Sequence, residues 1–364
     1  MGSVIFDKIN LFIQKINRYK VKNLRILGFK LITSCFNQDM STNDPKFFPI
    51  EKGEYVVAPG LRSLGHDFGN GDFDQKVFLI SSKFKEYRQN KLECRAERLS
   101  KYFCMKDLSA ERVNVLARFL IEELVKEYPQ YFIFRDQVLE CVHTGDRLIV
   151  DNNFDFLSFH SIDPISPPVE HILDALSLQV EEDLAMVCRS VEGENVKDHL
   201  GLLHLCSPSH WSAEDKIGMN FFDIHVPIPG IDKINRVADK LVETMINKGP
   251  YVRFIWSFVT DQRLNHHPTP PPGIDPVAWK GRSFNEDAAI PFYFRIERQV
   301  MWGFPHVDAS LFTIGVTFMS GLEVKNNPYQ RDQLISALKS MSPESRVYKG
   351  VAGCFDQLIS WLES

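Results

Sequence analysis

Apolar residues recur at helical spacing in several parts of the chain. From residue 110 to 128 they fall every three or four positions, and Ser109 stands where its side chain can cap the first turn. Weaker versions of this pattern predict further helices. We expect them within 78–99, over 169–190, from near Ser209 or Ser212, over 230–245, over 328–338 and over 353–362. Helices are therefore expected to dominate the first half.

Aromatic and β-branched residues mark the predicted strands. The clearest is 251–259, followed by 292–298 and 310–318, with a short apolar run at 201–206 and a turn with a short strand at 146–151. Short connections near the end of the chain favour an antiparallel sheet. No long linker and no repeat divides the chain. We therefore predict an α+β fold in a single domain over residues 41–364.

The N-terminal segment differs from this body. Residues 1–35 carry seven lysines and arginines against a single aspartate, and their apolar residues recur at helical spacing. We interpret residues 1–40 as a basic amphipathic extension. It either contacts a membrane surface, directs the chain to an organelle, or docks on the body with a solvated basic face. Apart from this segment, we predict a cytoplasmic location for the chain.

Net charge and cysteine usage exclude several classes of protein. The net charge is −5, so no nucleic-acid partner is expected. The seven cysteines are odd in number and form no C-x-x-C pair, which favours a reducing compartment over a disulfide framework, a structural zinc site or an iron–sulfur site. No apolar run reaches the roughly 20 residues that a membrane-spanning helix needs.

The densest polar cluster lies between two apolar, strand-like runs. Arg295, Glu297, Arg298 and Gln299 follow one another beside apolar runs. Burying such groups is costly unless each has a partner, so they serve either a ligand or a closed ion-pair network. Arg295 and Arg298 are three residues apart and should lie on opposite faces of a strand, so at most one of them faces a given pocket.

Histidines supply the candidate metal ligands. His225 stands between Ile224 and Val226 and precedes two prolines, a stiff apolar setting that suits an axial haem ligand. The alternative is a buried, hydrogen-bonded histidine. Cys141 and His143 form only a weak half of a zinc site. His266 and His267 lie in a proline-rich loop and are expected to be solvated. His210-Trp211 and Trp256 either line a planar cofactor or belong to the core.

Seven segments together resemble one family, the haem-dependent oxidative N-demethylases, in particular their haem-carrying α subunit. Each segment is weak alone, but they occur in the family's order over residues 75–362. They are 180–187, 206–218, 224–230, 256–261, 294–299, 310–314 and 341–350.

The resemblance implies a PAS-like antiparallel sheet elaborated with many helices and binding haem b. It implies a monooxygenase that uses dioxygen to demethylate a small amine, with electrons from a separate reductase. By position, His225 becomes the iron ligand, and Glu297 and Arg298 become catalytic residues. A further set would bind the cofactor: Arg295, Trp256 and His210.

Two departures from the family pattern bear on activity. Gly303-Phe304-Pro305 stands where the family reads R-L-P, and Gly315 stands where it has an arginine. If that arginine anchors a haem propionate or polarises oxygen, its absence alters haem affinity or catalysis. A haem or gas sensor without turnover is therefore the alternative hypothesis. An interaction protein without a cofactor is the third.

Overall fold

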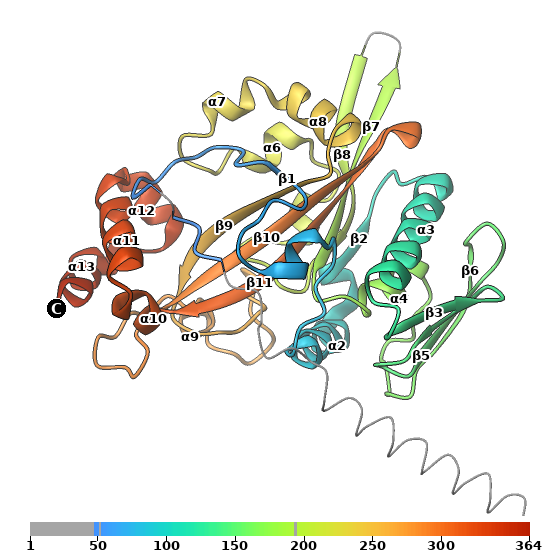
Figure 1. Ribbon diagram of the computed structural model, residues 1–364, viewed down its shortest axis with the longest axis horizontal. Coiled ribbons are helices and arrows are strands. Elements are labelled where there is room, and N and C mark those ends of the chain that lie inside the picture. The colour runs from blue at the N-terminus through green and yellow to red at the C-terminus, as the bar shows by residue number, and fades with distance from the viewer. Residues whose placement is uncertain (1–46, 51, 193–194) are drawn as a thin grey trace, which may run out of the picture. The chain divides into compact units, whose positions relative to one another are not determined.

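The computed structural model describes residues 47–50, 52–192 and 195–364. The chain divides into two compact units, Met1–Asp44 and Pro45–Ser364, and the described residues all belong to the second. The predicted basic extension lies outside the described residues, so its role stays a prediction. The described part is a mixed α/β structure with 12 α-helices and two antiparallel sheets (Figure 1).

The larger sheet has seven strands in the order β1-β9-β10-β11-β7-β8-β2. Its centre is a long hairpin in which Tyr293 pairs with Ser320 at one end and Phe304 with Ala309 at the other. At one edge of the sheet, β1 is short and pairs only with the first two residues of β9. The strands are β1 (Arg62–Ser63), β2 (Phe103–Met105), β7 (Asp183–Glu192), β8 (Asn195–His204), β9 (Tyr251–Val259), β10 (Tyr293–Phe304) and β11 (Ala309–Ser320).

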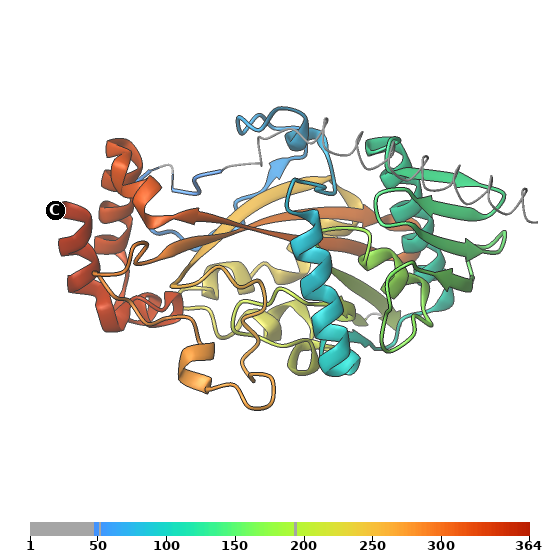
Figure 2. The ribbon, with the colours of Figure 1, turned by 90° about the horizontal axis from the view of Figure 1, so that it is seen from below.

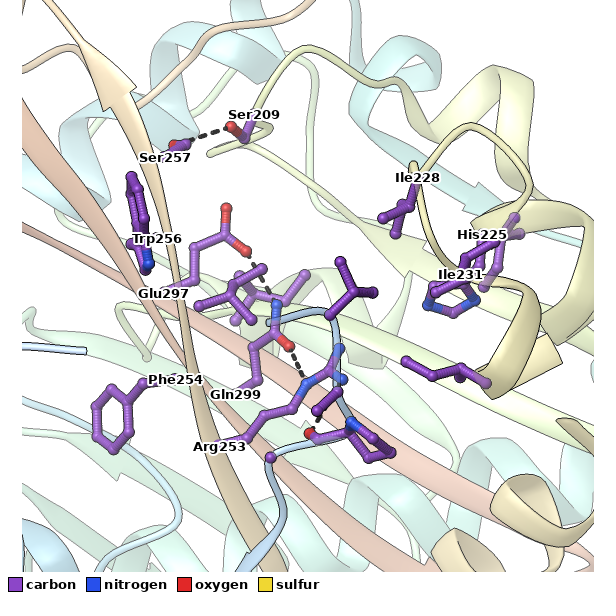
Figure 3. Close-up of a pocket in the computed structure, with 18 of the residues that line it drawn as sticks. Ser209, His225, Ile228, Ile231, Arg253, Phe254, Trp256, Ser257, Glu297 and Gln299 are labelled. Atoms are coloured by element: carbon purple, nitrogen blue, oxygen red, sulfur yellow. Dashed lines mark hydrogen bonds between the residues drawn. The ribbon is translucent and has the colours of Figure 1, made fainter. Parts of the chain in front are cut away.

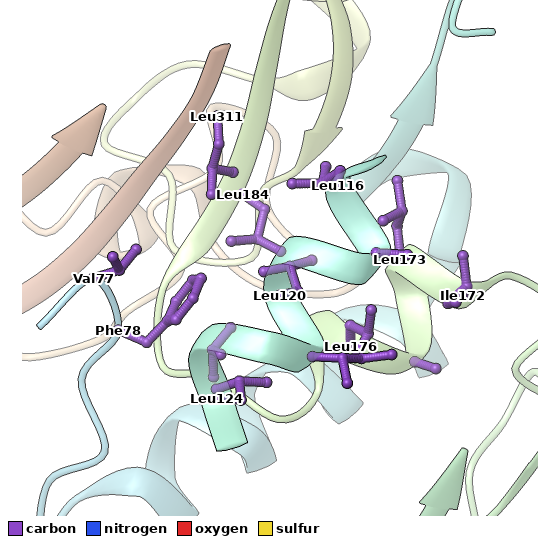
Figure 4. Packing of buried hydrophobic residues seen from close by; sticks show 14 of the residues in the cluster. Val77, Phe78, Leu116, Leu120, Leu124, Ile172, Leu173, Leu176, Leu184 and Leu311 are labelled. Carbon is purple, nitrogen blue, oxygen red and sulfur yellow. The ribbon is translucent and has the colours of Figure 1, made fainter. Parts of the chain in front are cut away.

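One face of this sheet is closed by a dry core. Helix α3 (Ala110–Glu127) begins at Ser109, whose side chain accepts a hydrogen bond from the backbone N–H of Arg112. Its leucines pack with those of α4 (Ile172–Ser177) against β7 and β11 (Figure 4). The smaller sheet adds to this core. Its strands are β3 (Phe132–Arg135), β4 (Val138–Cys141), β5 (Asp146–Val150) and β6 (Phe156–His160). We call this side the closed face.

Helices also cover the opposite face, but less completely. Helix α8 packs its apolar residues Val242, Met245 and Ile246 on β7, β10 and β11. The stretch from α6 to α8 forms a roof over this face (Figure 1). The roof helices are α6 (Phe221–His225), α7 (Asp232–Asn235) and α8 (Ala238–Asn247), preceded by α5 (Ala213–Lys216). We call this side the cavity face.

The remaining helices lie beside and beyond the sheet. Helix α2 (Phe84–Tyr102) buries several charged residues and donates a hydrogen bond from Tyr87 to the carbonyl of Val316. The last helices gather at one end of the long hairpin, away from the smaller sheet (Figure 2). They are α10 (Gly321–Asn326), α11 (Pro328–Ser340), α12 (Pro343–Lys349) and α13 (Phe355–Glu363). The short α9 (Pro276–Trp279) lies in the proline-rich loop region.

Several predictions from the sequence are confirmed and others are wrong. The strand 251–259 is found with the predicted bounds, and Ser212 caps α5. The two later strands are longer than predicted, because their pairing continues to Phe304 and Ala309 at one end and to Ser320 at the other. The helix over 169–190 is wrong: its first part is α4, and its second part is β7. Helices do hold more residues than strands in the described part of the first half, although the strands β1 to β6 also lie there. In the described part of the chain, no helix is both long and apolar enough to cross a membrane.

Candidate functional site

A large cavity lies between the cavity face and the roof. It encloses about 1110 Å³, more than the roughly 300–1,000 Å³ of a typical small-molecule pocket. Aliphatic and aromatic side chains make most of its wall, from β7, β8, β10 and β11 on one side and from the roof on the other. A small number of polar side chains interrupt this wall, and they gather in the places described next.

His225 reaches the cavity from the last residue of α6. The helix begins at Asn220, whose side chain accepts a hydrogen bond from the N–H of Asp223, and Pro227 follows it closely. The His225 Nδ1 lies 2.6 Å from the carbonyl oxygen of Phe221, so Nδ1 carries the proton and donates it there. Burial lowers the pKa of His225 to about 4. The ring is therefore neutral near pH 7, with its Nε2 lone pair free to bind a metal.

Three polar side chains form a chain on the opposite wall (Figure 3). Arg253 Nε donates to Gln299 Oε1 at 2.7 Å, and Gln299 Nε2 donates to Glu297 Oε2 at 2.9 Å. These side chains come from adjacent strands, because Gln299 on β10 faces Arg253 on β9. Glu297 also lies 3.7 Å from Arg295 Nη1. The amide of Gln299 thus links the guanidinium of Arg253 to the carboxylate of Glu297 on the sheet side of the cavity.

The two arginines of the sequence cluster lie on opposite sides of β10, as predicted. Arg295 lies on the cavity face beside Glu297, where it is fully buried and donates to the carbonyl of Ser207. Arg298 points to the closed face and donates to three carbonyls, those of Phe73, Lys76 and Val77. It does not line the cavity. These contacts are those of a structural ion, so the structure adds no support to the predicted catalytic role of Arg298.

A cationic group gathers at the open edge of β9. Lys349, from the end of α12, donates to the carbonyl of Trp256 and lies over the Trp256 ring at 5.0 Å. Burial lowers the pKa of Lys349 to about 8, although Glu297 attracts its charge. Arg282 lies close by, and its Nη2 lies 3.5 Å from the carbonyl oxygen of Tyr348. Trp256 lines the cavity, but its ring lies on the other side of β9 from Glu297 (Figure 3).

His210 also lines the cavity, beside two serines. Ser209 and Ser257 bring their hydroxyl oxygens to 3.4 Å from each other. Burial and, after it, nearby Arg282 lower the pKa of His210 to about 3, so this ring is neutral. The expectation that His266 and His267 are solvated is wrong, because both are almost fully buried. The loop that carries them packs beside the His210 segment rather than extending into water.

The other histidine and cysteine candidates form no metal site. His143 lies among Phe84, Tyr131 and Phe132, away from the cavity lining. Of the described His, Cys, Asp and Glu side chains, only Asp183, His204 and Cys206 lie close enough to share an ion, within 4.8 Å of one another. Lys91 interacts with Asp183 and Cys206 and already supplies a positive charge to that cluster.

Sequence reasoning missed most of the cations on the wall. Arg253, Arg282 and Lys349 line the cavity, but none of them entered the predicted site. Arg253 could have been found, because it is the one charged residue in an otherwise apolar strand. Lys349 lay within the segment 341–350 that carried the family resemblance. Arg282 follows a loop, and nothing in its sequence surroundings indicated a pocket.

A comparison with protein families now bears on this cavity. The model of the family described as haem-dependent oxidative N-demethylase, alpha subunit-like, matches residues 71–359. The chain belongs to this family. The match spans His225, Glu297 and the three cations of the wall, and it makes haem the group against which the cavity has to be tested.

The cavity of this N-demethylase α-subunit-like chain fits a haem. The wall is apolar and spacious, as a porphyrin requires, and it offers a neutral imidazole whose Nδ1–H is already bonded to a carbonyl. Such a second bond is typical of metal-bound histidine. Arg253, Arg282 and Lys349 offer cations to the carboxylates of the macrocycle's side chains. Arg282 Nε is buried and has no hydrogen-bond partner among the described residues.

The departure at Gly315 does not touch this cavity. Gly315 pairs with Arg298 and shares its closed face. A Cβ there would lie 3.4 Å from Glu182 Cγ and 3.5 Å from Leu79 Cδ1, and neither residue lines the cavity. The concern that a missing arginine at 315 removes a propionate anchor or an oxygen-polarising group is therefore not supported by the position of Gly315.

Proposed function

We propose that this chain binds haem b in the cavity through His225 Nε2 and acts as the haem subunit of an oxidative N-demethylase. One observation carries the proposal: a neutral imidazole, fixed through Nδ1–H, presents its free nitrogen to a large apolar cavity. The fold is proposed to be PAS-like. An antiparallel sheet with helices that enclose a cavity on one face supports that assignment.

The wall residues have separate roles in this proposal. Arg253, Arg282 and Lys349 bind the haem carboxylates, because each brings a positive charge to an enclosed wall where ion pairs are strong. Trp256 packs beside that end of the cavity. Glu297 accepts the N–H of a small amine substrate, and the hydrogen bond from Gln299 holds its carboxylate in place. Arg295 stabilises the negative charge of Glu297 through the ion pair between them.

The bound haem supplies the reduction of dioxygen, and the protein binds the amine and excludes water. The balanced reaction takes an N-methylamine, dioxygen, two electrons and two protons. It gives the demethylated amine, formaldehyde and water. The electrons come from a separate reductase, because the sequence carries no flavin, nicotinamide or iron–sulfur motif.

Absorption spectroscopy after haem reconstitution tests the binding step. We expect a Soret band in the wild-type protein and its loss or a marked shift in His225→Ala. His160→Ala, at an exposed histidine, is the matched control and should keep the wild-type spectrum. A wild-type protein without a Soret band, or a His225→Ala spectrum identical to wild type, contradicts the proposal.

A haem or gas sensor without turnover is the second candidate. It is favoured by Arg253, Arg295 and Lys349, which all interact with Glu297 and make this wall unfavourable for a positively charged amine. Reduction with dithionite, followed by oxygen and a set of small N-methylamines, separates the two candidates. Formaldehyde release supports the demethylase. Stable oxygen binding without formaldehyde for any amine supports the sensor.

A further inference from the structure

Three residues connect the solvent with the cavity beside Glu297. Asp261 is about one-third exposed, and its Oδ1 lies 3.0 Å from Nε2 of His266, whose side chain is fully buried. The His266 ring lies 5.5 Å from that of His210, measured between centroids, and His210 lines the cavity. We propose that Asp261, His266 and His210 form a proton relay from solvent into the cavity, which rests on the proposed demethylase function.

The two rings leave one nitrogen each for this step. His266 uses Nε2 on Asp261, so its second nitrogen is Nδ1. His266 Nδ1 and His210 Nε2 are both buried, and neither has a hydrogen-bond partner among the described residues. A histidine conducts a proton by accepting it at one nitrogen and releasing it from the other. Because the two rings are not hydrogen-bonded to each other, the proton passes between them through one bridging water.

The backbone holds the two rings beside each other. His210 donates its N–H to the carbonyl of His266 at 2.9 Å, and His266 donates to the carbonyl of Pro208 at 3.1 Å. His210 has a φ of +63°, a left-handed conformation that is costly for a residue with a side chain and that marks functional sites more often than other places. Gly281 packs against the edge of the His266 ring that faces Asp261, because a Cβ at position 281 would lie only 2.8 Å from His266 Nε2.

Surrounding charges keep the relay neutral at rest. Arg282, Arg295 and Lys280 face His210, while Arg263 and Arg295 face His266. Together with burial, these cations lower the pKa of both histidines, so an imidazolium does not persist on either. Burial alone would raise the pKa of Asp261, but the hydrogen bonds from His266 and Arg263 hold it below its usual range. The permanent carboxylate then stabilises a proton in passage through His266.

This path meets a need of the proposed reaction. Demethylation consumes two protons for each dioxygen, and one oxygen atom leaves as water. The wall near His210 is mostly apolar and offers few other groups that could carry a proton. If the relay is cut, electrons still reach dioxygen. They are then diverted to hydrogen peroxide, formed from dioxygen, two electrons and two protons that enter by slower routes.

His266→Gln cuts the relay, since an amide can bond to Asp261 but cannot carry a proton through a ring. We expect the formaldehyde formed per electron pair to fall by about tenfold or more, with a matching rise in hydrogen peroxide. Added imidazole should partly restore the yield. His267→Gln, at the neighbouring buried histidine, is the matched control and should retain it. A wild-type yield in His266→Gln overturns the relay.

A second measurement needs neither haem nor amine. In the full-length protein, ¹⁵N NMR of the histidine rings should show that Asp261→Asn shifts His266 and also His210, while His204 on the closed face stays unchanged. An unchanged His210 resonance overturns the relay, whatever the activity. If Asp261→Asn shifts the His210 resonance but the protein forms no formaldehyde with any amine, the proton relay is supported and the demethylase function is refuted.

Discussion

The two faces of the larger sheet bury charge in different ways. On the closed face, Lys91 donates to three carbonyls, those of Ser177, Val180 and Glu182, and Arg298 likewise bonds to three. On the cavity face, Arg295 is as deeply buried, yet its Nε and Nη1 have no hydrogen-bond partner within the described structure. Burial of a charge therefore does not identify a functional site. Arg88 and Arg95 on α2, away from the cavity, also leave Nε without a hydrogen-bond partner among the described residues. Incomplete bonding therefore indicates a site only where it lies beside a cavity.

The comparison predicts the largest effect on stability for the closed face. Lys91→Met leaves three carbonyls and the nearby Asp183 without their cation. Breaking a buried ionic contact in this way costs about 3–5 kcal/mol. We expect that loss in the free energy of unfolding, measured by chemical denaturation. Lys85→Met, at an exposed position on the same helix, should change it by less than ~0.5 kcal/mol. If both variants lower the free energy of unfolding equally, the buried contacts of Lys91 do not stabilise the closed face as described.

The cavity face should respond in ligand binding instead. Lys349→Met removes one cation from the proposed carboxylate site, and we expect haem affinity at pH 7 to fall about tenfold, or ~1.4 kcal/mol. The pKa of Lys349 is lowered to about 8, so the lysine is charged below that pH and neutral above it. Wild-type affinity should therefore weaken as the pH rises above 8, and that of Lys349→Met should change less. Haem titrations at pH 7 and 9 measure both effects.

The control for this prediction is Lys339→Met, an exposed lysine on α11 that pairs with Glu363. It should bind haem as the wild type does at both pH values. If Lys349→Met also binds haem with wild-type affinity and pH dependence, the cationic edge of β9 is not a carboxylate site.

A smaller effect is expected at His143, in the aromatic surroundings of the smaller sheet. Burial, and then Arg88, lower the pKa of His143 to about 3, against 6.5 for an ordinary histidine. The unfolded chain therefore binds a proton below pH 6.5 that the folded chain refuses, so this group costs stability as the pH falls from 6.5 towards 3. His143→Phe should be more stable than wild type by about 2 kcal/mol at pH 5. The advantage should shrink at pH 7.5, and an advantage that does not depend on pH would contradict the assignment.

The smallest effect is expected at Gly315. A Cβ there meets its nearest neighbours at 3.4–3.5 Å, which is ordinary contact. Gly315→Ala should change the free energy of unfolding by less than ~1 kcal/mol and leave the Soret band unaltered. A spectral change in Gly315→Ala would show that the closed face communicates with the haem site and would weaken the distinction between the faces.

The sequence predicted the fold where local pattern and final pairing agree. Strand 251–259 is aromatic and β-branched throughout, so its bounds were correct. The region 169–190 combines a short helix with a strand buried on both sides, and an apolar run of that kind has no distinct period. Of the smaller sheet, only β5 was predicted, as the short strand at 146–151. Strands β3, β4 and β6 were missed, because four or five residues are too few to establish an alternation.

The site was predictable only in part. Alternation along β10 correctly separated Arg295 from Arg298, because the side-chain period of a strand is fixed by geometry. Other site residues lie on loops and helix ends that are far apart in the sequence, and no local pattern predicts that they come together. They are Lys349, Arg282 and His266. His266 was misjudged for this reason: its proline-rich surroundings suggested an exposed loop, but the loop packs against the His210 segment.

Gly303 has a consequence for the position of the roof. The chain has no side chain at this position of β10, and the backbone of Ile246 at the end of α8 fills the space that a Cβ would occupy. An arginine, as in the R-L-P pattern, has no room there. Helix α8 therefore touches the strand backbone to backbone at this end. A side chain at position 303 would push this end of α8, which carries the cavity-lining Met245, away from the sheet.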